Sequence, residues 1–182
     1  ELSIDLQCSK KLLEDIIGDE VYGYRAPSFS ITDQALQVVA EQGYAYDSSL
    51  FCTKLNQRYG SLSSWSEASG PIQKLEQGIT EVTLSCCPVA GLRLPWAGGG
   101  YFRLLPYGVF QRGVRRTAQR LGVYTFYVHP WEFDSGQPRM YGLPQQLRFR
   151  HYVNLENTGQ RFARLVRDFS FEPVGSVVQW KN

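Results

Sequence analysis

The sequence is poor in several features that would point directly to a class of protein. Its 182 residues include two histidines and one methionine, and the formal net charge is only +2. No run of about 18 apolar residues occurs, so we expect no membrane-spanning segment. The small net charge gives no electrostatic reason to expect nucleic acid or an anionic membrane as a partner. The first seven residues lack the basic and apolar regions of a signal peptide, which favours a cytoplasmic location.

The four cysteines do not form a metal-binding pattern. None of the spacings between Cys8, Cys52, Cys86 and Cys87 is CxxC. The adjacent pair Cys86 and Cys87 cannot easily chelate one ion. We therefore expect thiols in a reducing compartment, with disulfide bonds as the alternative.

Aromatic residues, by contrast, are abundant. They make up 14% of the chain, whereas hydrophobic residues make up 43% and charged residues 20%. This composition is typical of a globular domain with a substantial core. Flat rings also suit the apolar faces of sugars, so the aromatic excess slightly favours a carbohydrate ligand.

Helical and strand patterns alternate along the first part of the chain. Apolar spacing predicts helices over 9–17 and 32–42, with short buried strands over 21–24 and 44–46. Alternation of this kind is typical of βα units, in which loops at the strand ends build the site. The sequence therefore predicts the α/β class.

The remainder of the chain is less regular. Residues 51–100 begin with a stretch rich in Ser, Gly and Asn, which predicts an inserted loop followed by a hairpin. Further on, a helix precedes an apolar strand that ends at His129. The sequence predicts strands over 72–75, 79–84 and 123–128, and helices over 107–121 and 155–169.

Three polar residues stand at the ends of predicted strands. His129 can act as a general acid or base because histidine titrates near neutrality, or it can simply be hydrogen-bonded there. Arg25 can hold a carboxylate in bidentate fashion, or it can form a structural ion pair. Asp47 can orient His129, or it can form the turn that Asp-Ser-Ser readily makes.

Taken together, several motifs of the chain resemble those of the polysaccharide deacetylase family. This family is also called the NodB-homology family or carbohydrate esterase family 4. The family's Arg-x-Pro motif resembles Arg25-Ala26-Pro27, which Phe29 follows after one extra residue. Its last motif, a histidine after an apolar strand, resembles Val128-His129. Four stretches are similar to a bacterial, exosortase-associated subgroup: 23–31, 46–49, 98–107 and 127–134.

The subgroup has a C-terminal extension containing Phe-Arg-His-Tyr, which is Phe149-Arg150-His151-Tyr152 here. The resemblance implies a partial (β/α) barrel lacking its first strands, followed by an α+β extension. Residues 1–134 would be the later part of the deacetylase domain, with the inserted region at about 51–100. Residues 135–182 would be the extension. A truncated barrel has open sheet edges, through which copies of the chain can pair as a homo-oligomer.

The resemblance also implies a chemistry. Family members use a divalent metal, usually zinc, to hydrolyse N-acetyl groups of a polysaccharide, and a histidine protonates the leaving amine. His129 would be this general acid, Arg25 would brace the catalytic base, and Asp47 would raise the pKa of His129. Residues implied to contact the polysaccharide substrate are Phe29, Arg103, Trp131, Glu132 and His151.

The metal ligands of the family are not found in the expected place. The Asp-Asp and His-x-x-x-His motifs come before Arg-x-Pro in the family, but no histidine and no Asp-Asp pair precede Arg25. We therefore expect a fragment of a metal-dependent deacetylase of an exopolysaccharide, which binds no metal and is inactive alone. The alternatives are an allantoinase-like hydrolase of small amides and a non-catalytic glycan-binding module.

Overall fold

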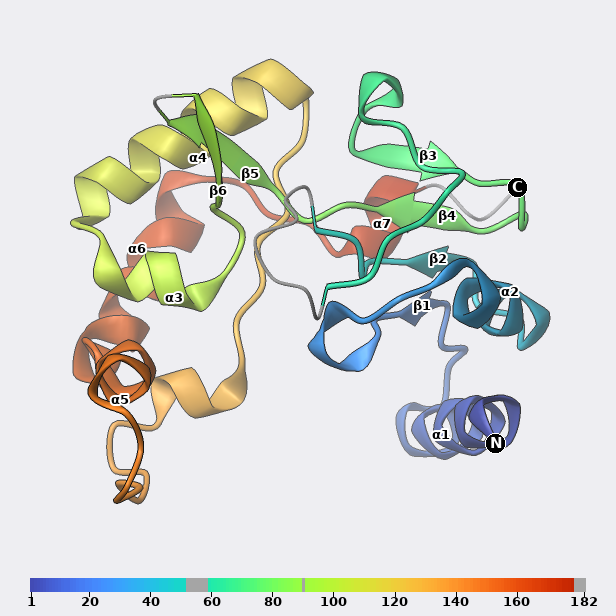
Figure 1. The fold of residues 1–182 in the computed structure, drawn as a ribbon, viewed down its shortest axis with the longest axis horizontal. Helices are drawn as coiled ribbons and strands as arrows, with labels where there is room; N and C mark the ends of the chain where they lie inside the picture. Colours follow the sequence, from blue (N-terminus) through green and yellow to red (C-terminus); the bar gives the residue numbers. More distant parts are fainter. Residues whose placement is uncertain (52–58, 90, 179–182) are drawn as a thin grey trace. The chain divides into compact units, whose positions relative to one another are not determined.

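The computed structural model in Figure 1 describes residues 1–51, 59–89 and 91–178. The chain divides into two compact units. The first unit comprises residues 1–84 together with 172–182, and the second comprises residues 85–171. The boundary predicted at residue 134 lies inside the second unit, and the division into residues 1–134 and 135–182 stays a prediction.

Among the described residues, no helix combines the length and the apolar character needed to cross a membrane.

A mixed sheet forms the centre of the first unit. Its four strands have the order β1-β2-β4-β3, in which β1, β2 and β4 are parallel and β3 is antiparallel. The strands are β1 (Gly23–Tyr24), β2 (Tyr46–Asp47), β3 (Ile72–Lys74) and β4 (Thr80–Val82). The predicted hairpin is present, with Gly78 in its turn at φ +80°. Its second strand, β4, pairs directly with β2, and the description of this region as an insertion stays a prediction.

The helices of the first unit are α1 (Leu2–Ile17), α2 (Asp33–Glu41) and α7 (Val174–Val178), with short 3₁₀ turns at Pro27–Phe29 and Glu67–Ser69. The two helices predicted for this unit are present, but α1 begins seven residues before the predicted start at residue 9, and α7 was not predicted. Thr32 caps α2, since its Oγ1 accepts a hydrogen bond from the Ala35 amide at 3.2 Å. Gly18 ends α1 in the left-handed conformation.

The core of the first unit lies mainly between α2 and the sheet. Helix α1 contributes only Leu6 to the buried set, and its remaining large apolar side chains are exposed. The buried apolar residues of this core are Leu6, Ala26, Ile31, Leu36, Val39, Tyr44, Leu50, Leu62, Leu75 and Ile79.

The second unit is mostly helical. Its strands β5 (Cys86–Val89) and β6 (Leu92–Pro95) form a two-stranded antiparallel sheet. Its helices are α3 (Gly99–Leu104), α4 (Tyr107–Leu121), α5 (Gln145–Tyr152) and α6 (Thr158–Asp168), with 3₁₀ turns at Pro130–Phe133 and Leu155–Asn157. Helix α4 ends at Gly122, in the left-handed conformation, as predicted.

The strand predicted over 123–128 is not formed. Only Tyr127 makes a ladder contact, a single parallel bridge with Gly98. The Thr125 amide instead donates to the Ser85 hydroxyl at 2.8 Å. A side chain therefore satisfies the backbone group that a neighbouring strand would otherwise bind. The segment still leads to His129 in an extended conformation.

Aromatic rings fill the core of the second unit. Trp96 stacks on Phe110 with ring centroids 5.8 Å apart, and its indole nitrogen donates to the Phe110 carbonyl at 3.0 Å. Gly113, one turn further along α4, leaves room for the Trp96 indole, which a β-carbon there would overlap. The buried residues of this core are Cys87, Trp96, Phe102, Phe110, Val114 and Leu165.

The prediction that the cysteines are thiols is wrong for one of them. Cys86 is disulfide-bonded, whereas Cys8 and Cys87 are free. Cys52 lies outside the described residues. The cytoplasmic location therefore stays a prediction.

The α/β class is confirmed, but a barrel is not. The described strands form one open sheet of four strands and a separate pair, with no closed barrel. Strands β1 and β3 are the edges of the larger sheet. Association of copies through these edges stays a prediction.

We predict opposite effects of alanine at two glycines of α4. Gly113→Ala should lower the free energy of unfolding by about 1–3 kcal/mol, because the added methyl group displaces the buried Trp96 ring. Gly108→Ala should be neutral or stabilising by up to about 1 kcal/mol, since a β-carbon there meets nothing within 4 Å. Denaturant unfolding of both variants measures the difference. Equal changes in the free energy of unfolding would show that the Trp96 ring does not restrict the side chain at position 113.

Candidate functional site

Two carboxyl groups of the first unit lie side by side on parallel strands. Asp47 on β2 is in register with Glu81 on β4, and both side chains are 0% exposed. Asp47 Oδ1 accepts from the Ser49 hydroxyl at 2.6 Å, and Oδ2 accepts from the Ser49 amide at 3.2 Å. Asp47 thus forms the local turn that was the alternative to its catalytic role. Its predicted support of His129 stays a prediction.

The two carboxyl groups share a proton. Burial, followed by the charge of Asp47, raises the pKa of Glu81 to about 10. Burial also raises the pKa of Asp47, although hydrogen bonds with Glu81 and Ser49 oppose the shift. Glu81 Oε1 accepts from the Leu50 amide at 3.0 Å. Glu81 is therefore neutral near pH 7.

Sequence reasoning missed Glu81. The only signal is a charged residue inside an apolar strand, Ile79-Thr80-Glu81-Val82, and its partner Asp47 is distant in the sequence. An acidic residue at such a position is rarely buried unless it is paired. That signal could have indicated a partner, but not which one.

Arg25 follows β1 and is held by the chain that follows β2. Its Nε donates to the Ser48 carbonyl at 2.7 Å, and its Nη2 donates to the Ser48 hydroxyl at 2.8 Å. The next amide, of Ala26, donates to the Ser49 hydroxyl at 2.7 Å. Ser49 also donates to Asp47, so the buried carboxyl pair and the Arg25 loop belong to one hydrogen-bond network.

The loop after Arg25 has an unusual backbone. Ser28 and Phe29 have positive φ angles of 55° and 59°, which non-glycine residues seldom adopt. The Phe29 ring is half-buried and packs edge-on against Phe51 at 4.8 Å. The Arg25 guanidinium lies 5.9 Å from the Phe29 ring centroid. These contacts hold an exposed cation beside an aromatic ring.

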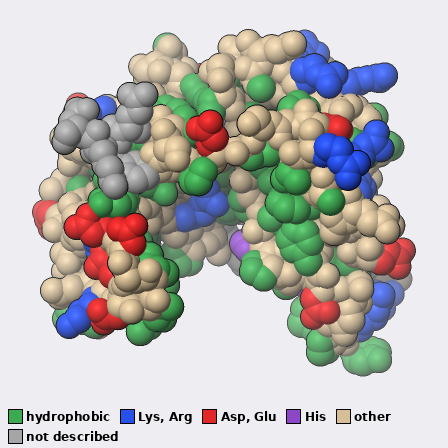
Figure 2. Space-filling view, turned by 180° about the vertical axis from the view of Figure 1, so that it is seen from behind, with side chains coloured by type: hydrophobic (Ala, Val, Ile, Leu, Met, Phe, Trp, Pro, Cys, Tyr) green, Lys and Arg blue, Asp and Glu red, His purple; other side chains and the backbone are tan. Residues whose placement is uncertain are grey.

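In the second unit, His129 stands exposed at the start of the turn Pro130–Phe133. Its amide donates to Glu132 Oε1 at 3.0 Å, which fixes the backbone of the turn. The imidazole contacts two aromatic rings, Tyr127 edge-on at 5.6 Å and Trp131 nearly parallel at 6.2 Å. A histidine side chain is visible at the surface in Figure 2.

A buried ion pair supports this turn. Arg103 Nε donates to Glu132 Oε2 at 2.9 Å, and both side chains are 3% exposed. Gly99 permits the approach, because a β-carbon there would overlap the Glu132 carboxylate. Arg103 and Glu132 are thus buried and bonded to protein groups. A supporting role fits them better than the substrate contact that the resemblance implied.

Arg103 also anchors helix α5. Its guanidinium donates to the carbonyls of His151 at 2.8 Å, Val153 at 2.9 Å and Arg150 at 3.3 Å. These carbonyls lie at the C-terminal end of α5, where the helix leaves them without partners. The same cation therefore fixes both the His129 turn and the end of α5.

His151 joins the aromatic cluster from α5. Its ring stacks on Trp131 with centroids 4.4 Å apart and planes 6° apart. Gln137 donates through Nε2 to the carbonyls of Trp131 and Asp134, both at 2.8 Å, so its Oε1 faces His151 Nε2 at 3.0 Å as an acceptor. Trp131 therefore contacts the rings of both histidines.

The described residues were also compared with the metal site that the resemblance implies. Among them, no group of three or more His, Cys, Asp and Glu side chains lies close enough together to hold an ion. The residues present do not fit a metal by themselves. Each predicted site residue is instead placed in one of two polar clusters, one in each unit.

We predict that Glu81 makes stability depend on pH. Its folded pKa is raised, so its stabilising effect is complete below the unfolded value of 4.5 and is lost as the pH rises towards about 10. The free energy of unfolding should fall by up to about 1.4 kcal/mol per pH unit in this range. Glu81→Gln, which mimics the neutral acid, should remove that dependence in unfolding measured from pH 5 to 9.

The matched control is Glu76→Gln, which makes the same change at an exposed position on the turn between β3 and β4. It should leave the pH dependence as it is in the wild type. A free energy of unfolding that rises with pH in the wild type would contradict the raised pKa of Glu81.

We further predict that Arg103→Met lowers the free energy of unfolding by about 3–5 kcal/mol, because Glu132 then remains buried and unpaired. Amide exchange in residues 145–153 should accelerate, since the end of α5 loses its donors. Arg120→Met, at an exposed position of α4, is the control. A loss below about 1 kcal/mol with unchanged exchange would show that the pair does not hold α5.

Comparison with known proteins identifies a family for most of the chain. Searches of curated proteins and of solved structures found no match. Residues 48–179 match the model of a family described as a domain of unknown function, DUF3473, which is associated with polysaccharide deacetylases. This match includes Glu81, the His129 turn and α5, and excludes Arg25. Because the model covers more than half of the chain, the protein belongs to the DUF3473 family.

Proposed function

We propose that this chain provides the proton donor and part of the substrate-binding surface of a polysaccharide N-deacetylase. His129 is the general acid, and the surrounding rings bind the sugar chain. The observation that carries the proposal is the exposed imidazole of His129, held by a buried ion pair and flanked by aromatic rings. The association of the DUF3473 family with polysaccharide deacetylases supports the same conclusion.

The hydrogen bonding of His129 is suited to proton transfer. Its backbone amide is bonded to Glu132, whereas its ring contacts are with aromatic faces and edges. The turn therefore fixes the backbone from which the ring projects. When an amide is hydrolysed, the departing nitrogen must gain a proton. In this proposal, the exposed imidazole of His129 donates that proton.

Several features suit a sugar polymer better than a small amide. The aromatic cluster extends from Tyr127 through Trp131 to His151 and Tyr152 at the surface of one unit. Flat rings pack well against the apolar faces of sugars. A cluster of this length offers contact with more than one sugar residue, which a small amide cannot use.

A separate proposal concerns Arg25 and Phe29 of the first unit. Arg25 is exposed and anchored by Ser48, so its guanidinium can orient a carboxylate. We propose that this carboxylate is the catalytic base. The base and the ligands of the implied metal would come from outside the described residues.

The test uses the full-length protein and an N-acetylhexosamine polymer. His129→Ala should lower kcat for acetate release by about 10²–10⁴-fold, which is the usual contribution of a general acid. The same variant should largely keep its activity on 4-nitrophenyl acetate, because 4-nitrophenolate leaves without a proton. Arg120→Ala, at an exposed position of α4, should behave as the wild type.

Equal losses on both substrates would contradict the general-acid role of His129. Acetate release only from small amides would favour the allantoinase-like alternative. Binding of the polymer without any acetate release would favour a glycan-binding module.

A further inference from the structure

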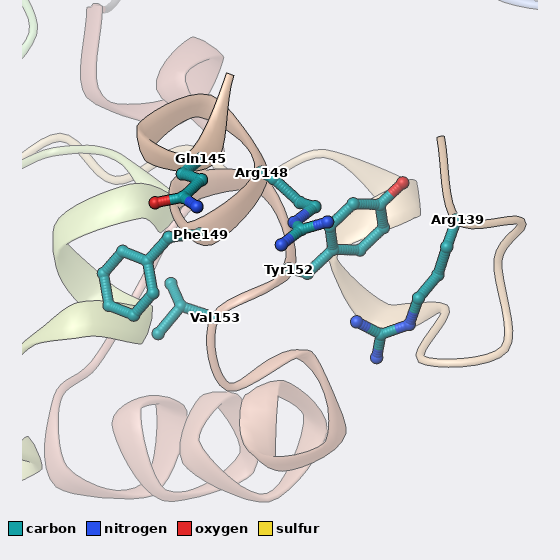
Figure 3. A pocket seen from close by; sticks show the side chains of 6 residues that line it. All are labelled: Arg139, Gln145, Arg148, Phe149, Tyr152 and Val153. Atoms are coloured by element: carbon teal, nitrogen blue, oxygen red, sulfur yellow. The ribbon is translucent and has the colours of Figure 1, made fainter. Parts of the chain in front are cut away.

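A pocket of about 520 Å³ lies beside helix α5. Figure 3 shows its lining side chains, which come from α5 and from the loop before it. Gln145, Arg148, Phe149 and Tyr152 recur at the spacing of one helix face. Arg139 reaches the pocket from the loop. Apolar rings and guanidinium groups therefore meet in one cavity.

The pocket has no carboxylate of its own. Between Asp134 and Glu156 the sequence has three arginines and no acidic residue. In the described part of the chain, neither Arg139 nor Arg148 forms an ion pair. An exposed pair of cations without a counter-ion favours an anionic ligand. Planar guanidinium groups bind carboxylates in bidentate geometry.

The loop that bears Arg139 is fixed in place. The Tyr152 hydroxyl accepts from the Met140 amide at 2.8 Å and donates to the Pro138 carbonyl at 3.1 Å. The Arg139 guanidinium lies 5.0 Å from the Tyr152 ring centroid. The two residues beside Arg139 are therefore tied to α5. This arrangement lowers the entropy that Arg139 loses when it binds a ligand.

A series of ring contacts connects Tyr152, which lines the pocket, with His129. Tyr152 contacts His151 with ring centroids 4.6 Å apart, and His151 stacks on Trp131 at 4.4 Å. Trp131 in turn lies 6.2 Å from His129. A polymer bound at His129 can reach the pocket within a few sugar residues. The anion that the pocket binds then belongs to the same polymer.

We propose that this pocket binds a hexuronic acid residue of the polysaccharide. Arg139 and Arg148 hold its carboxylate, and Phe149 packs against the apolar face of its ring. Phe149 is 59% exposed, so its ring is free to make that contact. The inference rests on the proposed function, since it names the class of polysaccharide on which the enzyme acts.

The test is calorimetric titration of the full chain with an oligogalacturonate and with the matching neutral galactose oligosaccharide. The uronate should bind more tightly, and the Arg139→Gln/Arg148→Gln variant should lose about tenfold or more of that affinity. Phe149→Ala should weaken the binding of the uronate as well. The control, Arg116→Gln/Arg120→Gln, removes the same charge from exposed positions of α4 and should bind as the wild type.

Equal binding of the two oligosaccharides, an equal loss in the control variant, or no binding at all would overturn the proposal. Tighter binding of a single-stranded oligonucleotide than of the uronate would also overturn it. Because the titration needs no turnover, its result is separate from that of the deacetylase assay. Binding of the uronate by a protein that releases no acetate would reject the proposed reaction and keep the pocket.

Discussion

The buried ion pair of Arg103 and Glu132 is the interaction on which the second unit's surface depends. Removing two charges from water is unfavourable unless both are fully bonded. Here Glu132 accepts from Arg103 and from the His129 amide, and Arg103 also donates to three carbonyls at the end of α5. One ion pair therefore connects the turn that bears His129 with helix α5, which lines the arginine pocket.

The first unit also buries two ionisable side chains, but both of them are acidic. Asp47 and Glu81 are both acidic and both buried, so two negative charges would repel each other in a medium of low dielectric constant. A shared proton removes one of the charges, and amides and hydroxyls bond the remaining oxygens. The network then reaches Ala26 through Ser49. The loop of Arg25 is thus supported through Ser49 by Asp47, which lies beside a neutral acid that the sequence did not reveal.

Local signals in the sequence predicted the longer helices and several of their ends, but they missed α3, α5 and α7 and predicted the pairing of strands poorly. Thr32 as a cap, Gly18 and Gly122 as helix ends, and the hairpin at Gly78 are encoded by neighbouring residues. The pairing of β4 with β2 depends on residues far apart, as does the contact of Asp47 with Glu81. The apolar run at 123–128 looked like a strand because hydrophobicity does not specify a pairing partner.

The candidate site shows the same limit. Motifs indicated residues that belong to the two clusters, but they did not indicate Glu81 or which of these residues are exposed, and exposure bears on their roles. Arg103 and Glu132 are buried, whereas His129 and Arg139 are exposed. Apolar residues in place of a buried ion pair are often neutral or stabilising, so the need for stability alone does not explain this pair. Its position is explained if it holds an imidazole and a guanidinium pocket at fixed places on one surface, where a charged sugar chain can meet both.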